Sequence, residues 1–185
     1  MSVPNFCDAG AKPIRGVKPI YCEKFVIGEA VTVKADDEDW GTVVKAIDYA
    51  RGKIIVAEIS GEERAVWGGL ASLNAKIFGV KGVVIYGYVR DVEDIIRLKF
   101  PVFAKGILPN AGKPIGRGKI NEPIKLDDIE IKPGDYIVMD KNGVAYIKRE
   151  ELENIKERVK KIKEKEKNIR EKILRGKSLA EILNL

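Results

Sequence analysis

The sequence predicts an α/β fold in which a parallel α/β layer joins a β-rich layer and is followed by a helical tail. Up to residue 108, strand patterns alternate with helical patterns, which is typical of parallel strands joined by right-handed crossovers. From 109 to 150, short strands separated by turn signals predict antiparallel pairing. We therefore expect one α/β domain over residues 1–150 and an amphipathic helical extension over residues 151–185.

The elements of the first half follow from their hydrophobic patterns. Residues 25–34 are rich in β-branched side chains and predict a strand. Residues 40–50 have helical apolar spacing, and residues 53–59 predict a strand buried on both faces. The alternation continues with a helix over 65–79, a strand over 82–86, a helix over 91–98 and a strand over 102–105.

The second half begins with a loop, residues 109–123, that is dense in glycine and proline. An Asn-Gly pair at 142–143 lies between two hydrophobic strands and predicts a hairpin. In the tail, apolar residues recur at three-four spacing until Gly176, and the sequence SLAE at 178–181 predicts a capping box for a last short helix. The apolar stripe of the tail is consistent with packing either on its own domain or on a sister subunit.

Composition narrows the chemistry available to this chain. Charged residues make up 34% of the sequence, above the roughly 25% typical of soluble domains. The excess of Lys and Glu indicates either a thermophilic source or genomic drift. There is no His and no Cys-x-x-Cys pair, so neither a zinc site nor imidazole acid–base chemistry is expected. Catalysis would need carboxylates, Arg, Lys, Tyr or a hard metal bound by oxygen.

The net charge of +6 comes largely from the tail, where eleven Lys and Arg face seven acids. The main body is close to neutral and has no basic patch interleaved with aromatic residues, so nucleic-acid binding is not predicted. The longest apolar runs are strand-sized and nothing resembles a signal peptide. We expect a soluble cytoplasmic protein without a membrane segment.

An arginine and an aspartate, Arg90 and Asp91, follow the predicted strand 82–86. Ligands of parallel sheets gather beyond the carboxyl ends of strands, and Gly87 is expected to allow a sharp turn there. Arginine can hold a carboxylate through two hydrogen bonds, and aspartate can ligate a hard cation. The alternative is that Asp91 caps the following helix while Arg90 is solvated.

Paired glycines, Gly68 and Gly69, stand in the sequence WGGLA. Free backbone N–H groups at a helix start form a cradle for an anion. Alternatively, the glycines serve only close packing of the helix. The segment 110–118 is Gly-rich and basic but lacks the ending of a P-loop, so it is either a flap near the site or an ordinary connection.

Taken together, residues 65–113 strongly resemble the family of the regulator of ribonuclease activity A, which includes metal-dependent 4-hydroxy-4-methyl-2-oxoglutarate aldolases. The succession strand, G-x-x-R-D, helix and FPVFA carries the resemblance. It continues through residues 132–150 and 169–182. The segment ADDEDW, residues 35–40, resembles a branch also found fused to hexulose-6-phosphate synthase.

The resemblance implies a β/β/α fold like that of swivelling domains, and a homotrimer or a dimer of trimers with active sites between subunits. It also implies that Arg90 acts in catalysis and binds a pyruvate-like group, and that Asp91 supports a divalent metal, magnesium or alternatively manganese. The backbone amides expected to bind the substrate are those of Gly68, Gly69, Leu70 and Ala71. A C-terminal glutamate of a neighbouring subunit is a further candidate, with Glu150, Glu151 and Glu153 in the right region.

The sequence departs from the family pattern at two positions. An acid usually stands twenty-one residues before the arginine, where this chain has Gly69, and Tyr86 replaces a common aspartate. Asp94 retains the acid three residues after Asp91. The resemblance predicts a metal-dependent lyase that cleaves a C–C bond of a small 2-oxo acid, by retro-aldol cleavage or by oxaloacetate decarboxylation. The missing acid favours the alternative, a regulator that binds a ribonuclease or another protein.

Overall fold

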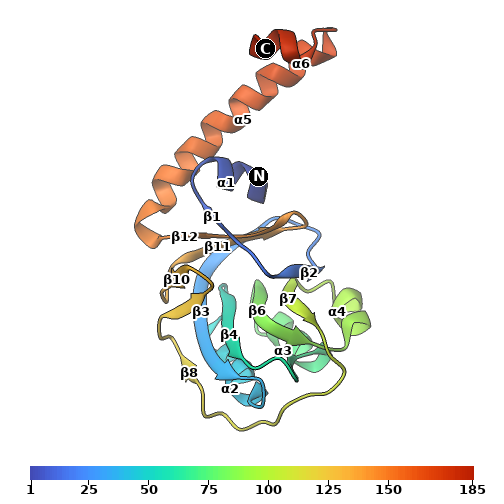
Figure 1. Ribbon diagram of the computed structural model, residues 1–185, viewed down its shortest axis with the longest axis vertical. Coiled ribbons are helices and arrows are strands. Elements are labelled where there is room, and N and C mark those ends of the chain that lie inside the picture. The colour runs from blue at the N-terminus through green and yellow to red at the C-terminus, as the bar shows by residue number, and fades with distance from the viewer.

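The computed structural model describes all of residues 1–185 and confirms the predicted fold class, a mixed α/β domain with a C-terminal helix (Figure 1). The strands are β1 Lys12–Ile14, β2 Lys18–Tyr21, β3 Val26–Asp36, β4 Ile54–Ser60, β5 Ala65–Trp67, β6 Gly82–Val89, β7 Val102–Ile107, β8 Lys119–Ile120, β9 Ile124–Leu126, β10 Ile129–Ile131, β11 Tyr136–Asp140 and β12 Gly143–Ile147. The α-helices are α1 Val3–Asp8, α2 Trp40–Lys45, α3 Gly69–Ile77, α4 Val92–Leu98, α5 Leu152–Leu174 and α6 Leu179–Leu183, with 3-10 turns at Ala46–Tyr49 and Arg149–Glu151.

One long strand, β3, connects the two layers. Its first residues pair antiparallel with β11, and the rest, from Ala30 to Asp36, pair parallel with β4. Strands β4, β6 and β7 continue the parallel part, with β5 added beside the end of β6. The predicted hairpin at 142–143 joins β11 to β12. The carboxyl ends of the parallel strands therefore meet at one edge of the sheet.

Three apolar clusters fill the layers. The first lies between the parallel strands and helices α2, α3 and α4, and the second lies on the other face of the same strands. The third joins β11 and β12 to α1 and the start of α5. Figure 1 shows α5 running away from the body, with α6 turned back at its far end.

The predicted helix over 65–79 is wrong in its first residues, which form β5. Ala65, Val66 and Trp67 are all buried, and a short apolar run buried on every side cannot be told from a helix by periodicity. The helix starts only after Gly68, whose backbone is extended. Strand β5 is functionally relevant because its three residues line the pocket of the candidate site.

Gly87 does not turn the chain as expected. It lies inside β6, which runs on to Val89, and a Cβ there would lie 2.9 Å from Cβ of Ile59. Gly87 therefore allows close packing against Ile59, and the strand ends two residues later, at Val89. Strand β7 likewise extends to Ile107, beyond the predicted end.

Other elements differ in smaller ways. The helix predicted over 40–50 is α-helical only to Lys45 and then tightens into a 3-10 turn. The expected loop over 109–123 contains β8, which pairs with β3. At the N-terminus, α1, β1 and β2 have no counterpart in the prediction because their apolar residues are too few to show a period.

The tail is helical as expected, and its capping box at Ser178 and Glu181 is present. Only the first turns of α5 are buried, through Leu152, Ile155 and Val159, which pack against α1. None of the helices, α5 included, combines the length and the apolar character that crossing a bilayer requires.

Candidate functional site

A pocket of about 280 Å³ opens where β5 and β6 end, between α2 and α3. It contains the predicted arginine and aspartate together with most of the WGGLA turn. The lining residues are Trp40, Val44, Ala65, Val66, Trp67, Gly68, Leu70, Ala71, Asn74, Arg90, Asp91 and Ala111. Of the residues predicted to bind substrate or metal within one chain, only Gly69 does not line it, and Gly69 stands between two residues that do. The candidate glutamates Glu150, Glu151 and Glu153 lie outside this pocket.

Arg90 reaches the pocket because it directly follows β6. Its amide donates to the carbonyl of Trp67 at 2.9 Å, which fixes the arginine beside the end of β5. The side chain is about half exposed, and its Nε lies 3.6 Å from Oδ2 of Asp91. This ion pair is solvent-reachable and leaves the other guanidinium nitrogens without a protein acceptor. Arg90 is therefore neither sequestered nor turned away from the WGGLA segment.

Asp91 takes the left-handed backbone conformation, with φ 56 and ψ 44, which aspartate tolerates better than most residues. Although it occupies the N-cap position of α4, its side chain makes no capping bond to that helix. Its Oδ2 instead accepts from the amide of Gly69 at 3.1 Å. A Cβ at Gly68 would lie 2.5 Å from the same oxygen, so a glycine there makes this approach sterically available.

Fewer backbone amides are free at the start of α3 than the sequence predicted. The Gly69 amide is taken by Asp91, whereas the amides of Leu70 and Ala71 donate to no protein group. These two N–H groups point out of the first turn of a helix, where the helix dipole favours an anion. Together with Arg90, they can receive one carboxylate.

Position 69, where an acid is expected, packs against Asp94 of α4. A Cβ at Gly69 would lie 2.8 Å from Cβ and 2.9 Å from Oδ2 of Asp94. A longer side chain at 69 would therefore collide with Asp94. The Asp94 carboxylate also pairs with Arg97 at 3.0 Å through its other oxygen.

The donor set suits a hard cation that keeps most of its water. Nowhere in the chain do three or more His, Cys, Asp or Glu side chains gather in a metal-binding group. The pocket offers the half-exposed Asp91 carboxylate, whereas Asp94, three residues further along, lies outside the lining and pairs with Arg97. Magnesium is commonly bound through one or two carboxylates, with water and substrate oxygens completing its shell. The residues present fit that mode and not a closed protein cage.

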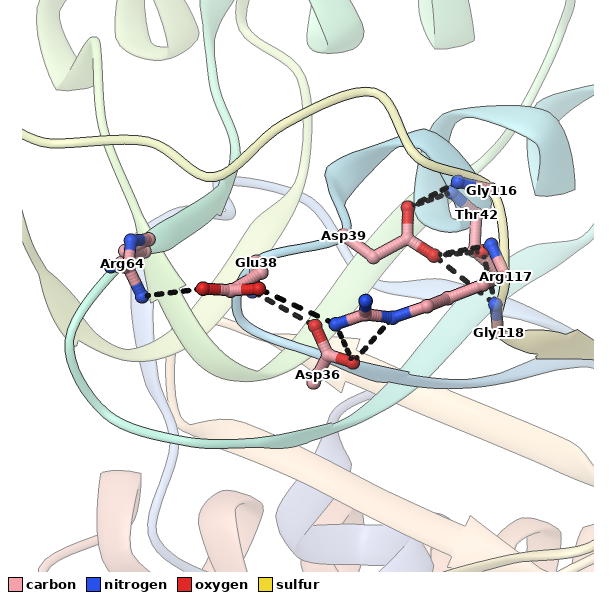
Figure 2. A network of polar contacts seen from close by, with 8 residues as sticks. All are labelled: Asp36, Glu38, Asp39, Thr42, Arg64, Gly116, Arg117 and Gly118. Carbon is pink, nitrogen blue, oxygen red and sulfur yellow. Dashed lines mark hydrogen bonds and ion pairs between the residues drawn. The ribbon is translucent and has the colours of Figure 1, made fainter.

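The acidic run Asp36–Asp39 holds two loops near the pocket, and Figure 2 shows the contacts of Asp36, Glu38 and Asp39. Asp39 is fully buried, and its carboxylate accepts from the Thr42 hydroxyl at 2.6 Å. It also accepts from the amides of Gly116, Arg117 and Gly118 at 2.6–3.1 Å. Burial by itself would raise the pKa of Asp39, but these hydrogen bonds outweigh it and hold the pKa well below its usual range.

The other acids of the run hold the neighbouring loops. Asp36 accepts from Nη2 and Nε of Arg117 at 2.8 and 3.1 Å. Glu38 pairs with Arg64 at 3.6 Å, and Asp37 accepts from the amides at 63 and 64. Segment 110–118 is therefore an anchored connection, and Ala111 is its one residue that lines the pocket.

Tyr86, which stands where the resemblance expects an aspartate, does not belong to this pocket. It packs with the second apolar cluster, on the opposite face of the sheet. Its hydroxyl donates to Asp127, and Nζ of Lys105 lies 4.3 Å from its ring centroid. Burial and the hydrogen bond to Asp127 raise the pKa of Tyr86 to about 12.

Sequence reasoning missed the apolar part of the pocket. Trp40 and Val44 come from α2, and Ala111 comes from the connection after β7. The indole N–H of Trp40 donates to the carbonyl of Gly112 at 3.1 Å, which ties these two walls together. In the sequence, only the segment ADDEDW, residues 35–40, which carries part of the family resemblance, pointed to the region of Trp40.

The sequence pattern of the RraA-like family (Aldolase/RraA) matches residues 3–146. The chain belongs to the RraA-like family. It is 61% identical over its full length to "Uncharacterized protein MJ0644" of Methanocaldococcus jannaschii, covering 90% of that protein. It is 35% identical to a protein of Halalkalibacterium halodurans named "Putative 4-hydroxy-4-methyl-2-oxoglutarate aldolase", over 77% of this chain and 69% of the relative.

Solved structures of other proteins share the fold. A Pseudomonas syringae protein superimposes with a TM-score of 0.85 at 25% identity, covering 98% of this chain and 88% of the other. The structure titled "RNA-processing inhibitor RraA" from Thermus thermophilis gives a TM-score of 0.67 at 24% identity, over 74% and 84% of the two chains. The first covers nearly the whole chain, whereas the second covers about three quarters of it.

Proposed function

We propose that this RraA-like protein is a divalent-metal-dependent lyase that cleaves a C–C bond of a small 2-oxo acid through a pyruvate enolate. The reaction is retro-aldol cleavage of a 4-hydroxy-2-oxo acid, decarboxylation of oxaloacetate, or both. One observation carries the proposal: Arg90, Asp91 and the unpaired amides of Leu70 and Ala71 line a single pocket. Relatives at 30–35% identity that are named as aldolases support the same reaction class.

In the proposed reaction, the guanidinium and N–H groups of the pocket bind the substrate, and the carboxylate binds the metal. The substrate carboxylate is received by Arg90 and by the amides of Leu70 and Ala71. In retro-aldol cleavage, a water in the pocket takes the proton of the 4-hydroxyl group and the C3–C4 bond breaks. Its electron pair passes into the enolate, and an aldehyde or ketone leaves. Protonation at C3 then gives pyruvate, and the guanidinium of Arg90 favours the negative charge that develops at the enolate oxygen.

Asp91 would hold the divalent cation, with magnesium as the first choice and manganese as the alternative. A cation there supplies Lewis-acid stabilisation of the charge that develops on the 2-oxo group. The chain itself contributes the carboxylate and its orientation. The Gly69 amide binds Oδ2 of Asp91, which lines the pocket.

We further propose that the protein works as a homotrimer, or a dimer of trimers, with α3 at the subunit contact. Leu70, Leu73 and Ile77 follow one another at helical spacing and are 84%, 41% and 72% exposed. Leu70 also lines the pocket, so a partner on this face would close the pocket mouth. An exposed apolar face of this kind is typical of an interaction surface.

Pyruvate release from oxaloacetate and from 4-hydroxy-4-methyl-2-oxoglutarate, with magnesium and with a chelator, tests the activity. We expect magnesium-dependent release that Arg90→Ala lowers by about 10²–10³-fold in kcat, the cost of losing one charge-stabilising donor. Arg51→Ala is the matched control because Arg51 is exposed and lies outside the pocket. Equal activity of Arg90→Ala and the control would contradict the proposal.

The second candidate function is a regulator that binds a ribonuclease or another protein. The exposed apolar face of α3 and the absence of an acid at Gly69 favour it. Folded protein that releases no pyruvate from either substrate, with magnesium or manganese, would favour this function. The grouping of Arg90, Asp91 and the amides of Leu70 and Ala71 in one pocket favours the lyase instead.

A further inference from the structure

The helical tail projects from the domain and lies outside residues 3–146, the part of the chain that the family pattern matches. Its base is packed, since the first turns of α5 are buried and the Asn5 side chain donates to Glu166 at 3.0 Å. Farther along, α5 packs against α6, which Figure 1 shows at the far end of the arm. The end of the tail is therefore a surface separate from the candidate active site.

The cations of this surface have no acidic partners within the chain. From Lys160 to Leu185 the sequence has nine Lys and Arg against four Glu. The ion pair of α5, Lys156 with Glu153 at 2.8 Å, lies near the base of the helix, and none of these nine cations forms one. Unpaired charges of one sign attract a partner of the opposite sign.

A hollow of about 460 Å³ lies between α5 and α6. It combines apolar and cationic side chains, namely Ile169, Ile182, Leu183, Lys161, Lys165 and Lys172, with Glu164 and Asn168 completing the lining. An engineered cavity of about 150 Å³ takes up benzene, so the hollow has room for an apolar side chain of a partner. Carboxylates next to that side chain would meet the three lysines.

The charges beside the apolar stripe of α5 disfavour a second copy of the tail as the occupant. Cations recur every seven residues on both flanks of the stripe, at Lys156, Lys163 and Arg170 on one side and at Arg158, Lys165 and Lys172 on the other. Residues at such positions face the flanking residues of a helix packed on the stripe. Two copies would bring cations together in either relative direction, whereas an acidic segment would pair with them.

The composition of the tail favours a protein partner over a lipid or nucleic-acid surface. Residues 151–185 contain no Trp, Tyr or Phe, the residues that commonly lie at a bilayer surface or stack on bases. The exposed apolar side chains are aliphatic: Ile173, Leu174, Leu179, Leu183 and Leu185. Exposed aliphatic groups next to unpaired lysines suit a segment that offers apolar and acidic side chains together.

We propose that the end of the tail is a docking site for an acidic segment of a partner protein. An apolar side chain of that segment enters the hollow between α5 and α6, and its carboxylates pair with Lys161, Lys165 and Lys172. The docking site lies outside the pocket at the ends of β5 and β6, so this inference is independent of the proposed lyase function.

Fluorescence anisotropy of a labelled synthetic peptide added to the full chain tests the proposal. The peptide has three heptads with leucine at both core positions and glutamate at both flanking positions, and a second peptide has lysine in place of glutamate. We expect the acidic peptide to bind, and to bind less tightly as salt rises from about 0.05 M to about 0.5 M. Lys165→Glu combined with Lys172→Glu should weaken its binding at least tenfold.

The matched control is Lys24→Glu combined with Lys141→Glu, which changes the net charge equally at two exposed lysines of the body. This control should bind the acidic peptide as the wild type does. The tail variant should instead bind the lysine peptide at least tenfold more tightly than the wild type does, a gain that unfolding of the tail would not produce. Leu183→Ser, in the hollow, should weaken binding of the acidic peptide at least fivefold.

Absence of binding of the acidic peptide by the wild type, or equal weakening in the control, would overturn the proposal. Polyglutamate that binds as tightly as the peptide would overturn the role of the hollow. Tighter binding of phosphatidylglycerol vesicles or of a single-stranded oligonucleotide than of the peptide, lost in the tail variant, would assign the surface to lipid or nucleic acid instead. Each of these outcomes would leave the lyase function standing.

Discussion

At the scale of single residues, two carboxylates that accept backbone amides join distant parts of the chain around the pocket. Asp91 accepts from Gly69 and thereby links the ends of two elements, β6 and α3. Asp39 accepts from three consecutive amides and links α2 to the connection after β7. Each bond joins parts of the chain that are far apart in sequence, so the pocket depends on both.

Asp39→Asn should lower the free energy of unfolding by about 2 kcal/mol or more, because an amide group would face donors that now bind a buried carboxylate. Urea denaturation monitored by tryptophan fluorescence measures the change. Asp128→Asn, at an exposed aspartate without a partner, is the control and should stay within about 0.5 kcal/mol of wild type. Equal stability of the two variants would contradict the role assigned to Asp39.

The pKa of Asp39 gives this contribution a defined pH dependence. Its folded pKa lies below the value of 3.8 that applies without the fold, so the unfolded chain binds the proton more readily. The stabilisation is therefore complete above about pH 5 and is lost as pH falls through the folded pKa. The stability difference between wild type and Asp39→Asn should be constant from pH 5 to 8 and should shrink below about pH 4. A difference that grows on acidification would contradict this assignment.

At the scale of elements, α5 divides into a packed part and a projecting part. Ile155 is buried against α1, whereas Ile173, on the same apolar stripe, is 44% exposed. The hydrophobic periodicity of the sequence is the same at both positions. Only the folded chain shows that α1 ends partway along α5 (Figure 1).

Ile155→Ala should cost about 2–5 kcal/mol of stability because it opens a cavity in the third apolar cluster. The same substitution at Ile173 should cost well under 1 kcal/mol in the monomer. Thermal unfolding of both variants followed by circular dichroism makes the comparison. Similar losses at the two positions would mean that the far part of α5 is also packed in solution, against a partner copy.

At the scale of the whole molecule, the site lies where the carboxyl ends of β5 and β6 meet helices α2 and α3. The apolar face of α3 borders the pocket, so assembly and substrate binding are coupled in our proposal. The division at residue 150 stays a prediction, although Leu152, Ile155 and Val159 share a cluster with residues of β11 and β12.

Light scattering should give a mass of about three times 20.6 kDa, or twice that for stacked trimers. Ile77→Asp should dissociate the assembly because it buries a charge in the proposed contact. Leu174→Asp, on the projecting part of α5, should leave the assembly intact. The opposite outcome would assign the subunit contact to the tail, the alternative that the sequence left open.

The sequence alone determined the fold class, the order of most elements, and the Arg90–Asp91 pair beside the WGGLA turn. These features are local, because periodicity, turn residues and a short motif are enough to predict them. The family resemblance adds the chemistry expected of the motif. Even so, the strand β5 was read as helix, because a run buried on all sides carries no period.

Only the tertiary structure decided what surrounds the motif. Asp91 binds the Gly69 amide instead of capping α4, Asp94 covers Gly69, and Trp40, Val44 and Ala111 form an apolar wall. These contacts join segments from four parts of the chain. Their geometry follows from how the parallel strands and their crossovers pack, a property of the folded chain that no local window of sequence contains.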